Sequence, residues 1–88
     1  MTLSYIFDTY AKTAQGKTLH FNVALDEEDQ QQALIYARHW LEGIGLEEDA
    51  VVTPENCYFY HSLVVPAEMR VDIDRQGYAI YKMEGCPR

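Results

Sequence analysis

The stretch DEEDQQQALIYARHWLEGIG, residues 26–45, decides the fold, because it is the one long amphipathic segment of an 88-residue chain. Its acidic start is typical of a helix N-terminus: Asp26 is a good N-cap, and Asp29 stands in the capping-box position. Gly43 or Gly45 can end the helix by adopting a left-handed conformation. At the helical period, the apolar side chains fall on one arc. This arc consists of Ala33, Leu34, Ala37, Trp40, Leu41 and Ile44.

Such a helix cannot stand alone. Full burial of its apolar arc contributes on the order of 10 kcal/mol, whereas ordering the backbone costs roughly 1–2 kcal/mol for each residue. The helix therefore needs a sheet to lie on, and we expect Trp40 to anchor that contact.

Two segments before the helix have the pattern of strands joined by a turn. Residues 3–10 are rich in β-branched and aromatic side chains, and residues 17–25 alternate between apolar and polar. Gly16 supplies the turn with a residue that tolerates positive φ. We expect an antiparallel pair, with the second strand half-buried. Its apolar face carries Leu19, Phe21, Val23 and Leu25, and its polar face carries Thr18, His20 and Asn22.

The chain after the helix predicts short strands and a second, shorter helix. An acidic connector comes first, and the segment around Pro54 is a turn or a brief helical turn with Thr53 as its cap. The expected elements are strands at 50–53, 57–65 and 78–83 and a helix at 66–76, which Gly77 closes. The predicted fold is therefore α+β: one domain over residues 1–88, in the order β-β-α-β-β-α-β. A mostly antiparallel, curled sheet is packed by one long and one short helix.

Composition excludes several classes of function. The formal net charge is −7, and the seven Lys and Arg residues make no run, so we expect no binding to nucleic acid. No segment approaches the roughly 18–20 apolar residues of a membrane span, and the N-terminus lacks the pattern of a signal peptide. We predict a cytoplasmic protein in which Cys57 and Cys86 are free thiols.

A zinc site formed by Cys57, His61 and Cys86, with His20 as a possible fourth ligand, is the sharpest chemical hypothesis. Thiolate and imidazole groups suit zinc, which prefers four ligands in a tetrahedron. However, if residues 57–61 form a regular strand, Cys57 and His61 share a face about 13 Å apart. The sequence therefore makes these residues weak candidates, and the expected cofactor is none. A thiol-dependent reaction has less support still, because the chain has no C-x-x-C motif.

Other polar and aromatic residues have two interpretations each. His20 and Asn22 could line a small-ligand pocket, although solvent-exposed strand residues are the commoner outcome. Asp8, set among apolar strand residues, must find hydrogen-bond partners. The aromatic residues could stack bases or hold a partner peptide, but without adjacent basic residues cross-strand packing is favoured. This group consists of Tyr58, Phe59, Tyr60, Tyr78 and Tyr81.

Several short motifs carry a family resemblance, and they spread over nearly the whole chain. They are CYFYHS at 57–62, YKMEGC at 81–86, DTY at 8–10, His20-Phe21 and Gly77-Tyr78. On these residues the chain resembles a small bacterial family, domain of unknown function two-thousand-and-twenty-four. The resemblance implies a compact α+β domain and no assigned activity. The family's middle motif is C-x-x-C-H-S, and here Tyr60 replaces its second cysteine.

Two functions are therefore expected from different classes. The favoured one is a non-enzymatic binding or regulatory module that contacts a protein or a small ligand, with a homodimer through an open sheet edge as one arrangement. The alternative is a metal- or thiol-dependent protein that uses Cys57, His61 and Cys86. No phosphate-binding loop, nucleotide fingerprint or nucleophile elbow supports a stronger enzymatic hypothesis.

Overall fold

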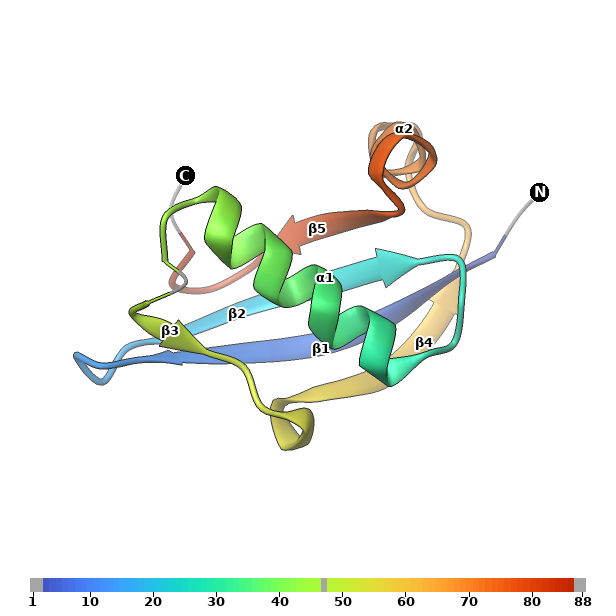
Figure 1. Cartoon of the computed structure of the whole chain (residues 1–88). Coiled ribbons are helices and arrows are strands. Elements are labelled where there is room, and N and C mark those ends of the chain that lie inside the picture. Colours follow the sequence, from blue (N-terminus) through green and yellow to red (C-terminus); the bar gives the residue numbers. More distant parts are fainter. Residues whose placement is uncertain (1–2, 47, 87–88) are drawn as a thin grey trace.

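The structure is a computed structural model that describes residues 3–46 and 48–86. Within these residues, five strands form one antiparallel sheet, and two helices lie against it (Figure 1). The predicted α+β class and element order are confirmed. The elements are β1 (Ser4–Thr13), β2 (Thr18–Leu25), α1 (Gln30–Gly43), β3 (Ala50–Val51), the 3₁₀ turn η1 (Pro54–Asn56), β4 (Cys57–Leu63), α2 (Ala67–Gln76) and β5 (Tyr78–Lys82).

The long strand β1 is the centre of the sheet. It pairs with β2 along one side, from Tyr5 opposite Leu25 to Lys12 opposite Thr18. On its other side it pairs with β4 near its start and with β3 at its end. β5 adds to the far side of β2. The sheet therefore has β3 and β4 at one edge and β5 at the other.

The first face of the sheet carries the main core beneath α1. Alternating side chains of β2 point towards the helix, and Phe21 is completely buried. Its ring centroid lies 4.6 Å from that of Trp40, which packs against the core as the sequence predicts. The helix ends just before Gly45, which takes the left-handed conformation at φ 78°. The buried helix residues are Ala33, Leu34, Ala37 and Leu41.

The start of α1 differs from the prediction. The N-cap is Asp29, whose carboxylate accepts hydrogen bonds from the backbone N–H groups of Gln31 and Gln32. Asp26 instead bonds to residues outside the helix, because its Oδ1 accepts hydrogen bonds from Ser4 Oγ at 2.9 Å and from Arg70 Nη2 at 2.7 Å. The predicted cap at Asp26 is therefore wrong, because this carboxylate joins α2 to the beginning of β1.

The second face of the sheet is covered only in part. Helix α2 begins after Pro66, ends at Gly77 in the left-handed region, and packs Ile73 onto this face. The smaller core there consists of Ile6, Ala24, Val65, Ile73 and Ala79, with Leu63 and Met69 partly buried against it. Beyond α2, the rest of this face is open, and we call it the open face.

Candidate functional site

A row of four side chains crosses the open face, one from each of four strands. Strand register places Tyr58 of β4 opposite Asp8 of β1, Asp8 opposite Asn22 of β2, and Asn22 opposite Tyr81 of β5. Two hydrogen-bond acceptors thus lie side by side, with an aromatic ring at each end of the row.

Asp8 is the centre of a hydrogen-bonded cluster in this row. Its Oδ1 contacts Nε2 of His20, and its Oδ2 accepts hydrogen bonds from the hydroxyl groups of Tyr10 at 3.4 Å and Tyr58 at 3.2 Å. The imidazole of His20 stacks on the ring of Tyr10, with centroids 4.2 Å apart. Since the Asp8 and His20 side chains are only 15% and 19% exposed, these contacts satisfy a carboxylate that burial alone would destabilise.

The same cluster alters the titration of Tyr58. The neighbouring hydroxyl of Tyr10 has the largest influence, followed by partial burial and the Asp8 carboxylate; together they raise the pKa of Tyr58 to about 12. A raised pKa means that the fold favours the neutral phenol, so the stabilisation is complete below pH 10 and is lost as the pH rises through about 12. The Tyr58 hydroxyl therefore acts as a donor at neutral pH.

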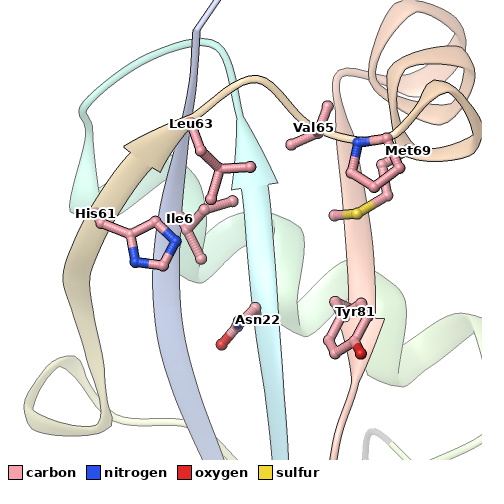
Figure 2. A pocket seen from close by; sticks show the side chains of 8 residues that line it. Ile6, Asn22, His61, Leu63, Val65, Met69 and Tyr81 are labelled. Atoms are coloured by element: carbon pink, nitrogen blue, oxygen red, sulfur yellow. The ribbon is translucent and has the colours of Figure 1, made fainter.

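A hollow of about 210 Å³ opens on this face between the row and α2. Figure 2 views it from the side opposite α1, which lies behind the strands. Its walls are largely apolar, and its polar atoms come from three side chains at the floor and rim. The lining residues are Ile6, Asn22, His61, Leu63, Val65, Pro66, Met69 and Tyr81.

Asn22 lies at the floor of the hollow. Its Oδ1 is buried, and within the part of the chain that the structure describes it has no hydrogen-bond partner. Leaving a buried acceptor unpaired costs about 1–3 kcal/mol. An atom kept at that cost beside an apolar hollow marks Asn22 as a candidate for ligand recognition.

The structure separates the residues of the zinc hypothesis. Cys57 is fully buried on the α1 side, where Thr9 Oγ1 donates to its Sγ at 3.6 Å. Cys86 follows β5 and donates its S–H to the carbonyl oxygen of His20 at 3.3 Å. Because β1 and β2 lie between β4 and β5 in the sheet, the two thiols are held at opposite sides of that pair of strands.

His61 lies on the open face, so the expectation that it shares a face with Cys57 is wrong. The reason is a bulge: Ile6 pairs with His61 but Phe7 pairs with Phe59, which leaves Tyr60 as an extra residue that shifts the alternation. Across residues 3–46 and 48–86, no three His, Cys, Asp or Glu side chains gather as a metal site would require. The arrangement gives the zinc hypothesis no support, and the zinc content of protein purified without chelator is its test.

Both thiols are expected to react slowly with an alkylating reagent at neutral pH. Burial raises the pKa of Cys57 and, likewise, of Cys86, so little thiolate is present. Cys57, which is completely buried, should react only after global unfolding, and the partly buried Cys86 should react first. Mass spectrometry of iodoacetamide-treated protein, with denatured protein as the control, measures both rates. Rapid labelling of Cys57 in the folded protein would contradict this assignment.

The cross-strand packing favoured from the sequence is found for Phe59 but not for Tyr78, which packs against α1. Phe59 lies at the edge of the sheet, with its ring centroid 5.9 Å from that of Phe7. Tyr78 is buried, stacks on Tyr36 at 4.6 Å and shares a hydrogen bond of 2.8 Å with Nδ1 of His39. Tyr81, in contrast, lines the hollow.

Sequence reasoning singled out Asn22 and Asp8 but missed most of the hollow. Its apolar walls come from residues that the sequence presents as ordinary core, namely Ile6, Leu63, Val65 and Met69. The one sequence signal for these wall residues is Pro66. It starts α2 directly after β4, so the helix lies over the end of the open face rather than over its middle.

The fold and this face define the chain as a small α+β domain whose antiparallel sheet has one covered and one half-open side. The chain belongs to the family described as a domain of unknown function (DUF2024), whose model matches residues 1–83. It is similar to protein NE1680 from Nitrosomonas europaea, whose NMR structure has a TM-score of 0.84 and 42% identity. The alignment covers 97% of this chain and 99% of that chain. The comparison with curated proteins gives no match.

Proposed function

We propose that this chain is a binding module that recognises a compact apolar group through the hollow on its open face. The observation that carries the proposal is the position of Asn22 at the floor of an apolar hollow: among the described residues, none is a hydrogen-bond partner of its buried carbonyl oxygen. Neither helix within the described ranges is long and apolar enough to cross a membrane.

The size of the hollow limits what can enter it. Pockets for drug-sized ligands measure roughly 300–1,000 Å³, and this hollow measures about 210 Å³. It fits one short alkyl or aromatic group, either the end of a small molecule or one side chain of a protein partner. A turn of the Asn22 amide about its Cβ–Cγ bond offers a hydrogen bond to a polar atom next to that group.

The polar groups around the hollow favour binding over chemistry on the ligand. The Asp8 carboxylate is engaged by three neighbouring side chains rather than directed at the hollow. His61 and Tyr81 lie at the rim, where Figure 2 shows them on opposite sides of Asn22. They are placed to contact the polar end of a ligand whose apolar end is buried.

The test is a pair of opposite effects of Asn22→Leu. The substitution removes an unsatisfied acceptor, so the free energy of unfolding should rise by about 1 kcal/mol. It also removes a hydrogen bond to the ligand, so the affinity for n-hexanol, followed by NMR titration, should fall about fivefold. Asn56→Leu, which changes a partly buried asparagine of η1 outside the hollow, is the matched control and should change neither quantity.

Three hexyl compounds and one peptide distinguish the two sources of such a group, which are the end of a small molecule and one side chain of a protein partner. Hexanol, hexylamine and hexanoate share a tail and differ in the charge of the head, so binding by all three indicates that the tail alone is recognised. A hexapeptide with one central leucine tests the partner side chain. If none of the probes binds at millimolar concentration, the proposed function is wrong.

A further inference from the structure

We propose that a second copy of this chain pairs with it along the exposed edge of β4, which gives a two-fold symmetric dimer. This inference goes beyond the proposed function, because it uses a different surface and does not depend on the hollow.

β4 has a free edge along most of its length. Among the described strands it pairs only with β1, and its opposite side has no strand neighbour (Figure 1). One carbonyl on that strand, that of Cys57, accepts a hydrogen bond of 2.8 Å from the side chain of Gln30. Unpaired backbone groups at a sheet edge are a template for another strand, and proteins usually protect such edges.

Two of the protections present on β5, short length and a charged side chain, are missing from β4. Edge strands are commonly guarded by short length, charge or a covering helix. β5, at the opposite edge, has five residues, carries Lys82 and packs against α2. β4 has seven residues, CYFYHSL, with no Asp, Glu, Lys or Arg. In a chain of net charge −7, this strand therefore adds no formal charge of its own to a contact between two copies.

The exposed aromatic residues on β4 supply the apolar area for that contact. Tyr58, Phe59 and Tyr60 are 45%, 44% and 61% exposed. Aromatic side chains bury roughly 150–250 Å² each, so half-exposed rings offer on the order of 300 Å² of the ~800 Å² that each partner gives to a standard interface. The dimer should therefore be weak, with a dissociation constant in the micromolar range or above.

The geometry also stops the assembly at two copies. When β4 of one copy pairs antiparallel with β4 of the second copy, both copies use the same surface, so neither copy keeps a free β4 edge for a third. The bulge at Tyr60 interrupts the regular ladder and so shortens the stretch that can pair. β5 keeps its lysine-bearing edge on the outside of each copy.

Sedimentation velocity over a range from micromolar to millimolar concentration tests the dimer. The native chain should shift from monomer to dimer, and Tyr60→Lys should weaken the dimer at least tenfold by placing positive charges across the two-fold axis. Val71→Lys is the matched control, because Val71 is also 61% exposed but lies on α2. It should leave the dimer unchanged.

Amide hydrogen exchange locates the contact without a substitution. As the concentration rises, amides of β4 should become more protected while those of β5 do not. A chain that stays monomeric at millimolar concentration overturns the inference, and so does a dimer that tolerates Tyr60→Lys and shows no added protection in β4.

Discussion

Phe21→Ala is expected to lower the free energy of unfolding by about 3–5 kcal/mol, the largest effect of any single substitution considered. Phe21 is completely buried between α1 and the sheet, against Trp40, so truncation leaves a cavity that the surrounding strands cannot fill. Domains of this size are stable by only about 5–15 kcal/mol. The loss should shift the melting temperature by at least about 12 °C, at roughly 4–8 °C for each kcal/mol.

Trp40 provides the measurement, because its fluorescence reports on the contact that the substitution removes. Urea unfolding followed by that fluorescence gives the change in free energy. Phe59→Ala is the matched control: Phe59 is 44% exposed at the sheet edge, so its truncation should cost less than half as much. Equal losses for the two phenylalanines would mean that α1 does not cover Phe21 as described.

Gly77→Ala is expected to destabilise the protein by about 2–5 kcal/mol, the second largest effect. Gly77 ends α2 at φ 97°, a conformation that costs an L-residue about 1–2 kcal/mol. A Cβ there would also lie 2.6 Å from the hydroxyl oxygen of Tyr36, and such overpacking costs roughly 1–3 kcal/mol more. Chemical denaturation of the variant measures the sum.

Two further variants separate these causes. Gly16 has φ 85° but open space around it, so Gly16→Ala should show the backbone cost alone. Adding Tyr36→Phe to Gly77→Ala removes the closest atom and should restore part of the loss. If Gly16→Ala and Gly77→Ala were equally destabilised, the steric contact with Tyr36 would have no role.

The helices and strands could be predicted because each rests on a local pattern. The apolar arc of α1 and the apolar–polar alternation of β2 match the side chains that the fold buries. The end of α2 at Gly77 follows from the conformational freedom of glycine. Asp26 misled the prediction because two acidic residues could cap the same helix, and the choice depends on Arg70, which is 44 positions away in sequence.

The candidate site could be predicted only in part, because it depends on register. Asp8 stood out as a carboxylate among apolar strand residues, and Asn22 as a residue on the polar face of an alternating strand. Their adjacency, however, follows from the pairing of β1 with β2. His61 reaches the open face only because of the bulge at Tyr60, and no local pattern in CYFYHSL indicates a bulge. The hollow itself exists because α2 covers one end of the sheet, which is a property of tertiary packing.

The central claim, that the open face binds a compact apolar group, is tested most directly by intermolecular nuclear Overhauser effects between n-hexanol and the methyl groups of the protein. We predict contacts from the hexyl chain to methyl groups of Ile6, Leu63 and Met69, which line the hollow. Contacts confined to Leu34 and Ile35, beside a different depression on α1, would contradict the claim.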